Sequence, residues 1–416
     1  MRRSCFILFL FVLPFMSFAQ EQSFIMLNDT SIKETITASV KFEMNSNSLT
    51  NEFINAYYRG DFISQDIKNR SLNRMNSTNT FGYSLQSELE WKHALGNEEN
   101  PTHVFVKVVQ HSINEMRFTD ELFRLVFYGN DGFIGKTAKF TNSGFQSLNY
   151  LQLKAGLSYN FPCKSGVHTV QIALGLNLGQ NHINASVNKG ELYTQPGGEH
   201  IYLGLDANIQ QTDTANNSFF NFNGWGPNVD LSYQYTFKQK NSIGFSLENF
   251  GYIEWNNKSF DHNIDTAIHY RGVEINDVFA IPKDIFMNEL DSLKNEILYN
   301  SYQSQYITYT PFTIKLYYVQ PLLKNKLLLT LEGGYTVFSY QNPYVGIQAL
   351  WHISPNFFLT PMFRYGGYGK LNIGASAGVS QWKGFSLLIY SQFLNGFISP
   401  SNSSGEGFGI FLSKQF

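Results

Sequence analysis

Charged side chains recur at alternate positions in several stretches of the chain, and this spacing bounds the chemistry that they can do. Glu88 and Glu90 are two residues apart, and residues of both signs take similar places elsewhere. Alternate positions of a β-strand share one face, so these side chains would point into one interior. The predicted inward-facing residues are Glu88, Glu90, Lys154, Asp206, Asp230, Glu248, Lys315, Glu332 and Arg364. Such an interior can filter solutes, hold a plug by ion pairs, or be solvated or internally paired.

No arrangement of residues predicts catalysis. The nine histidines are scattered, and none lies in a Ser-His or His-Asp arrangement. The sequence has no HExxH, CxxC or P-loop motif, and no GxGxxG between a strand and a helix. Metal ligation by His262 and His269 is the one alternative that the histidines offer. We therefore predict a protein that is not an enzyme and has no metal or other cofactor.

The elements that must position these charges are amphipathic strands. Apolar and polar residues alternate most clearly in residues 151–160, 170–179, 201–210, 229–238 and 243–248. The polar face carries mainly Gly, Ser, Asn, Gln and Thr, whereas a soluble sandwich would also carry many Lys and Glu. Strands of about ten residues suit a tilted membrane crossing of about 9–11 residues better than the soluble average of about 5–6. The pattern favours a membrane barrel over a soluble sandwich.

Composition supports this choice. Aromatic residues make up 16% of the chain, with 24 Tyr and 38 Phe, and there are 33 Gly against only 15% charged residues. Aromatics suit strands and membrane interfaces, and Gly suits tight turns and crowded strand faces. Mean hydropathy is −0.21 and no later stretch approaches 18 unbroken apolar residues, which excludes a helical membrane bundle. A net charge of −2 gives no reason to expect nucleic acid as a partner.

Both ends of the chain carry signals. Residues 1–19 combine Arg2 and Arg3, an apolar run and a Ser-Phe-Ala site, which predicts a cleaved signal peptide; an uncleaved anchor is the alternative. Cleavage would leave Cys163 alone and so exclude an internal disulfide. The last twelve residues alternate and stop on an aromatic residue, as the final strand of an outer-membrane barrel does. The apolar face of this barrel-closing strand consists of Phe408, Ile410, Leu412 and Phe416.

Three segments interrupt the alternation. Residues 45–79 predict two short helices separated at Gly60-Asp61, either plugging the lumen or lying over the rim as a structured loop. Residues 116–128 predict a helix that Thr119 can cap and that Gly129 ends. Residues 282–299 predict an amphipathic helix that docks on the rim, lies on lipid or contacts a partner.

The predicted fold is all-β, with a signal peptide over 1–19 and a single outer-membrane barrel domain over 20–416. Turns such as 323–326 and 354–356 are short and alternate with longer loops, which matches short periplasmic turns and long outer loops. Dividing the chain among such hairpins predicts a closed antiparallel transmembrane β-barrel of about fourteen strands, within a range of about 12–16, with a few short helices in loops.

Four blocks resemble a family of Bacteroidetes outer-membrane proteins known only as a domain of unknown function. The blocks are Gly60-Asp61-Phe62-Ile63, residues 79–83, residues 122–130 and residues 249–255. The resemblance spans most of the chain after the signal peptide. It implies a barrel similar to the long-chain fatty-acid transporter FadL and the secretion-associated barrel PorV. The family has no established catalytic or binding residues, so no residue role is carried over.

Two function classes follow. The first is a FadL-like, porin-like channel or uptake barrel for small or hydrophobic solutes in the bacterial cell outer membrane. The second is a non-transporting structural or assembly barrel that presents its loops to an envelope export or surface machine. The partners expected in either case are outer-membrane lipid and the barrel-assembly machinery, and an envelope protein in the second case.

Overall fold

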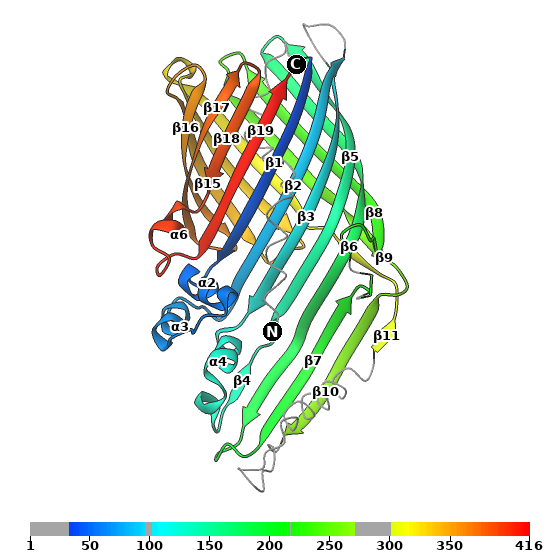
Figure 1. Cartoon of the computed structure of the whole chain (residues 1–416), viewed down its shortest axis with the longest axis vertical. Helices are drawn as coiled ribbons and strands as arrows, with labels where there is room; N and C mark the ends of the chain where they lie inside the picture. The colour runs from blue at the N-terminus through cyan, green and yellow to red at the C-terminus, as the bar shows by residue number, and fades with distance from the viewer. Residues whose placement is uncertain (1–32, 96–101, 214, 217, 271–300) are drawn as a thin grey trace, which may run out of the picture.

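The computed structural model describes residues 33–95, 102–213, 215–216, 218–270 and 301–416, which form a closed antiparallel β-barrel (Figure 1). Fourteen strands make the ring, so the predicted fold and strand number are confirmed. In order around the ring they are β1 (Glu34–Ser46), β2 (Asn79–Leu95), β3 (Thr102–Phe118), β5 (Gly144–Cys163), β6 (Gly166–Thr194), β8 (Gly224–Phe237), β9 (Ser242–Trp255), β13 (Phe312–Leu322), β14 (Leu327–Val337), β15 (Asn342–His352), β16 (Phe357–Gly367), β17 (Leu371–Trp382), β18 (Phe385–Ser391) and β19 (Gly405–Gln415).

The last strand closes the ring. β19 pairs with β18 on one side and with β1 on the other, in a continuous register from Thr35↔Gln415 to Asn45↔Gly405. Phe408, Ile410 and Phe416 are exposed on the outward face, and Leu412 shares that face. Phe411, between them, is buried inside the barrel. The carboxy-terminal strand therefore lies where its alternation predicts, with its apolar face outward.

A belt of exposed apolar side chains covers the outside of the ring. Each of the fourteen strands contributes at least one large apolar residue that is more than a third exposed. One example per strand is Ile36, Leu89, Val106, Leu157, Leu174, Tyr233, Ile243, Leu316, Leu331, Val345, Phe363, Ile373, Ile389 and Ile410. A water-soluble protein rarely exposes a continuous apolar patch larger than a few hundred Å². The belt is therefore a surface suited to lipid.

Short helices lie at the end of the barrel where the longer loops are (Figure 1). Gly60, with φ +69°, separates α2 (Asn51–Arg59) from α3 (Gln65–Leu72), so the two predicted helices are confirmed. The Thr119 side chain caps α4 (Asp120–Tyr128), as predicted, but 116–118 belong to β3 rather than to the helix. η1 (Asp131–Phe133) and α6 (Leu394–Ile398) also belong to this end, whereas η2 (Leu323–Asn325) is the short turn between β13 and β14 at the opposite end.

Helices α2, α3 and α4 form what we call the helical shelf, which packs against the outer wall. Phe53 of α2 and Phe123 of α4 are each 3% exposed, and their rings lie 5.3 Å apart. They share one core with Phe118 of β3 and with Phe42, which lies across from Phe408 of the apolar belt. Residues 45–79 are therefore a structured loop at the rim, and the alternative of a plug in the lumen is wrong.

Strand β6 is 29 residues long and continues beyond the ring. Its first half pairs with β8, whereas Ile183–Thr194 pairs with β7 (Ile201–Gln211) in a sheet that projects past the rim (Figure 1). The further strands of this end are β4 (Thr137–Lys139), β10 (Phe260–Tyr270), β11 (Ser301–Gln303) and β12 (Tyr306–Tyr309). We call β7, β10 and the second half of β6 the projecting sheet.

Two predicted segments, the signal peptide over 1–19 and the helix over 282–299, lie outside the residues that the structure describes. Over the described residues, the structure holds no helix whose length and apolar character would let it span a membrane.

The shelf yields a stability prediction. Phe53→Ala removes a buried ring from the core that the shelf shares with the wall, which costs about 3–5 kcal/mol. We expect the shelf to detach locally, so that limited trypsin digestion cuts after Arg59 faster while the barrel stays folded. The control is Phe62→Ala, because Phe62 is 89% exposed and has little packing to lose. Equal cleavage rates in the two variants would contradict the described packing.

Cys163 gives a chemical marker for the opposite end of the barrel. It lies at the β5–β6 hairpin, fully exposed, and hydrogen bonds from the Ser165 hydroxyl and backbone amide lower the pKa of its thiol to about 6. Because the thiolate is the reactive form, its alkylation by iodoacetamide should be constant above about pH 7 and fall as the pH drops through 6. The control, Lys324→Cys with Cys163→Ser, should still accelerate up to about pH 8.5. Parallel pH profiles would show that Ser165 does not act on the thiol.

Candidate functional site

The lumen holds a network of paired charges, which we call the charged belt. Lys107 of β3 lies with its Nζ 2.6 Å from Glu90 Oε2 and 3.5 Å from Glu88 Oε1. Lys154 of β5 lies with its Nζ 2.8 Å from Asp230 Oδ2. The register places Glu90 opposite Lys107 and Lys107 opposite Lys154, so one row of inward positions carries the charges. Charges removed from water in this way need close partners, and each of these has one.

A missing side chain on β6 allows the second pair to form. Lys154 is on β5 and Asp230 on β8, so the lysine must cross the intervening strand at Gly175. A Cβ atom on Gly175 would lie 2.8 Å from Lys154 Cγ. Lys154 also donates to Asn249 Oδ1 at 2.7 Å, and the Asn249 backbone amide donates to Asp230 at 2.7 Å. The pair is thereby tied to β9 as well.

The other predicted inward residues take separate places. Glu248 of β9 pairs with Lys315 of β13, with Oε2 and Nζ 3.3 Å apart. Arg364 of β16 lies over the Tyr344 ring at 3.5 Å and donates to the Gln392 side chain at 2.9 Å. Glu332 of β14 lies beside Gly346 of β15. The described lumen is thus internally paired rather than lined by free charges.

The prediction that Asp206 lines the lumen is wrong. Asp206 is exposed on β7, which belongs to the projecting sheet and not to the ring. The alternation of residues 201–210 predicted a strand correctly. It could not show that β6 outruns the ring and pairs with this strand beyond the rim.

The short-turn half of the lumen carries an apolar cluster on the wall from β14 to β19. Phe358, Leu388, Leu350 and Phe411 are each at most 3% exposed and pack together inside the ring. Three cavities formed by the described residues lie elsewhere, toward the end with the longer loops. None of these four residues lines them.

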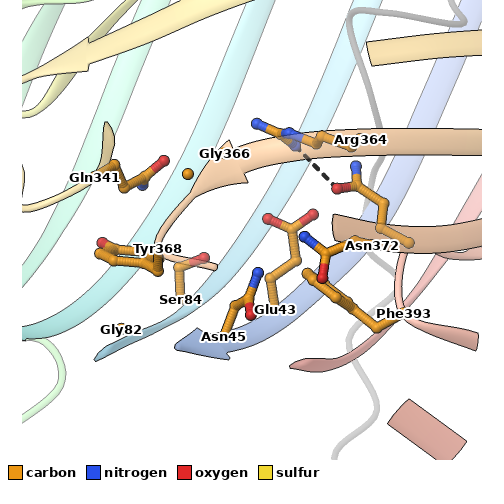
Figure 2. Close-up of a pocket in the computed structure, with 12 residues that line it drawn as sticks. Glu43, Asn45, Gly82, Ser84, Gln341, Arg364, Gly366, Tyr368, Asn372 and Phe393 are labelled. Atoms are coloured by element: carbon orange, nitrogen blue, oxygen red, sulfur yellow. Dashed lines mark hydrogen bonds between the residues drawn. The ribbon is translucent and has the colours of Figure 1, made fainter. Parts of the chain in front are cut away.

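The larger inner cavity meets the wall between β1 and β2. Its volume is about 160 Å³, and it is lined by Lys41 and Glu43 of β1, by Ser84 and Gln86 of β2, and by residues of the facing wall. Leu85 also lines it, although the side chain of Leu85 is 41% exposed on the outward face of β2. A smaller cavity of about 40 Å³ continues along the same two strands (Figure 2).

These cavities touch the wall at the joint between β1 and β2. The two strands keep one register from Glu34↔His93 to Ser46↔Phe81 and lie side by side along their length. The ends are fastened: the Ala94 amide donates to Lys33 O at 2.8 Å, and the Asn47 amide donates to Thr80 O at 3.2 Å. We call this joint between β1 and β2 the seam. On its other side, β1 pairs continuously with β19.

A third cavity, of about 360 Å³, lies at the end with the longer loops. Its lining combines the rings of Tyr309, Phe338 and Tyr340 with Arg117 and several side-chain amides. His182 also lines it; this imidazole is stacked 5.4 Å from Trp255 and bonded through Nδ1 to the Tyr306 hydroxyl at 3.0 Å. The lining is aromatic and polar, as binding cavities commonly are.

Metal binding has no support among the described residues, where no three His, Cys, Asp or Glu side chains are grouped to hold an ion. His262 and His269 both lie on β10, and the His269 ring stacks on Tyr202 at 4.3 Å.

Comparison with known protein families shows which family the chain belongs to. A model of the family of unknown function DUF5723 matches residues 31–390. The chain belongs to this family. No curated protein matches it. The DUF5723 family assignment agrees with the expected domain of unknown function.

Solved structures similar to this DUF5723 chain are barrels. They include a TodX deltaS2S3 mutant, a monoaromatic hydrocarbon channel (9% identity, 97% of this chain and 96% of that one covered, TM-score 0.48). A second is the Pseudomonas putida toluene transporter TodX (8%, 96% and 94%, TM-score 0.41). A third is a Pseudomonas aeruginosa FadL homologue (7%, 97% and 98%, TM-score 0.43). Likenesses at this level do not establish a function.

The charged belt gives a test of the lumen. Lys107→Met leaves Glu88 and Glu90 buried without their cation, which typically costs about 3–5 kcal/mol. We expect a lower urea midpoint for the folded barrel, followed by its heat-modifiable mobility on gels. Lys189→Met is the control, because the Lys189–Glu191 pair on the projecting sheet is exposed and worth at most about 1 kcal/mol. Equal midpoints would show that Lys107 is not a buried counter-ion.

Proposed function

We propose that this protein is an outer-membrane barrel that takes up small or hydrophobic solutes and releases them sideways through the seam between β1 and β2. The proposal rests on one observation: the inner cavity meets the wall at the β1–β2 joint, where Leu85 lines the cavity although its side chain is 41% exposed on the outward face. The export signal predicted over residues 1–19 and the apolar belt favour the bacterial outer membrane as its location.

The side chains along the seam suit such a passage. Lys41, Glu43, Ser84 and Gln86 line its inner edge, so a solute leaves a polar lumen. Val40 and Leu89 share the outward face of the two strands with Leu85, so the solute arrives at an apolar exterior.

A disulfide across the seam tests this route. The same number of residues separates the two ladder pairs on each strand, so Val40 lies opposite Ser87. In a Cys163→Ser background, Val40→Cys with Ser87→Cys should form a disulfide that closes the seam. Uptake of toluene and of a fluorescent fatty acid by cells with this variant should fall about tenfold on oxidation and recover with a reductant.

The matched control keeps one partner. Val40→Cys with Ile410→Cys forms its disulfide across the intact β1–β19 ladder, where these two residues are paired. We expect its uptake to equal that of the Cys163→Ser protein in both redox states. Undiminished uptake with a fully oxidised seam disulfide would rule out this exit.

A second candidate, a non-transporting assembly barrel, is favoured by the projecting sheet. This sheet extends the barrel beyond the rim, as a surface that presents itself to another envelope protein would. Planar-bilayer recordings separate the two candidates. Solute-dependent conductance supports the conduit, whereas a silent barrel that co-purifies stoichiometrically with one envelope protein supports assembly.

A further inference from the structure

Two turns from one wall of the barrel reach across its mouth to the opposite wall. Residues 338–341 join β14 to β15, and residues 368–370 join β16 to β17. Both turns contact Glu115 of β3. In the ring of fourteen strands, β15 lies seven strands from β3 in either direction. The turns therefore bridge the full width of the lumen.

A single carboxylate oxygen holds both turns. Glu115 Oε2 accepts hydrogen bonds from the Ser339 hydroxyl at 2.6 Å, the Tyr340 backbone amide at 3.1 Å and the Tyr368 hydroxyl at 2.6 Å. Glu115 is 1% exposed, so water does not compete for these contacts. Hydrogen bonds to a charged group are about twice as strong as those between neutral groups.

The β16–β17 turn lies on the inner side of the seam (Figure 2). The Tyr368 ring covers Gly82 of β2, where a Cβ atom would lie 2.3 Å from Tyr368 Cζ. The Thr80 hydroxyl donates to Tyr368 O at 2.9 Å. Gly369 meets β1, because a Cβ atom there would lie 2.7 Å from Asn45 Cγ. The turn thus touches β1, β2 and β3 together.

We propose that residues 366–370 are a latch that closes the mouth side of the seam cavity, and that the Tyr368–Glu115 hydrogen bond holds it shut. This regulation rests on the function proposed above. Gly366 and Gly367 have φ of +111° and +74°, backbone conformations that favour glycine and form the bend from which the latch swings. Polar contacts to one carboxylate, rather than a packed apolar core, fasten its tip.

The first test reads the position of the latch without relying on transport. Ser84→Cys, in a Cys163→Ser background, places a thiol in the cavity behind Tyr368. Tyr368→Phe and Glu115→Gln should each raise its reaction rate with a bulky, membrane-impermeant maleimide about tenfold, equal to about 1.4 kcal/mol. The double variant should gain little more than either single one, since both remove the same contact.

Two variants control for nonspecific loosening. Tyr365→Phe removes a hydroxyl from the same hairpin, but Tyr365 is 59% exposed on the outward face. Gly132→Ala matches Gly82→Ala, and nothing lies within 4 Å of its added methyl group. Gly82→Ala should displace the Tyr368 ring and raise the labelling rate, whereas both control variants should label like the parent. Folding of every variant is checked by heat-modifiable gel mobility.

The second test fixes the latch in place. Asn45→Cys with Gly369→Cys, again with Cys163→Ser, puts a sulfur near the position of Asn45 Cγ, within bonding reach of the Gly369 position. Oxidation should reduce both Ser84→Cys labelling and toluene uptake, and a reductant should restore them. Labelling that ignores the disulfide, the Tyr368→Phe change and the Glu115→Gln change would overturn the latch.

The outcomes separate this inference from the function on which it rests. If labelling responds to the latch variants but no form of the protein takes up a solute, the latch stands as a moving part and the conduit proposal fails. If the seam disulfide blocks uptake while the latch variants change neither labelling nor uptake, the conduit stands and the latch is wrong.

Discussion

Every backbone amide and carbonyl that faces lipid needs a partner within the protein, because hydrocarbon offers none. The closed ring meets this demand from strand to strand, and the carboxy-terminal strand completes it at the β1–β19 joint. Opening the joint between β1 and β2 would expose backbone groups, which is costly in lipid. This joint is also where the inner cavity reaches the wall.

Charged groups in the lumen also have partners within the protein. Lys107 forms ion pairs with both Glu88 and Glu90, and Lys154 forms an ion pair with Asp230. Glu115 has no cation in the described contacts; its Oε2 instead accepts hydrogen bonds from hydroxyl and amide donors of two turns. The cation-paired groups join strands of the same wall, either adjacent or with one strand between them, and stiffen that wall. The hydroxyl-paired group joins opposite walls through turns, which makes it the contact best placed to break without opening the ring.

Local patterns in the sequence predicted most of the barrel, because alternation records directly which face of a strand meets lipid. The closing strand with Phe408 and Ile410, and the helix break at Gly60, follow from neighbours in the chain. Lys107 was missed because its strand also turns Val109 inward, so the alternation there is weak. Asp206 was misplaced because a strand beyond the rim alternates as a ring strand does.

The candidate site was less predictable than the fold, for a related reason. Tyr368 and Glu115 lie on opposite walls, and their meeting depends on ring size and on how far a turn folds inward. Neither quantity leaves a mark on the spacing of residues along one strand. The seam gives no sequence signal either, because β1 and β2 alternate as the other ring strands do. Only the Gly at position 82, in a strand otherwise rich in larger side chains, signals that another group approaches closely.

The length of β6 has a consequence for how a cell would present this protein. Residues 187–194 continue the same strand beyond its pairing with β5, which amounts to roughly 26 Å at the usual rise per residue. β6 continues from the barrel wall into the projecting sheet, where it pairs with β7, and β7 pairs with β10. This end is therefore a stiff sheet rather than a flexible loop. If the long-loop end faces outward, an antibody or a phage would meet the projecting sheet before it could reach the mouth of the barrel.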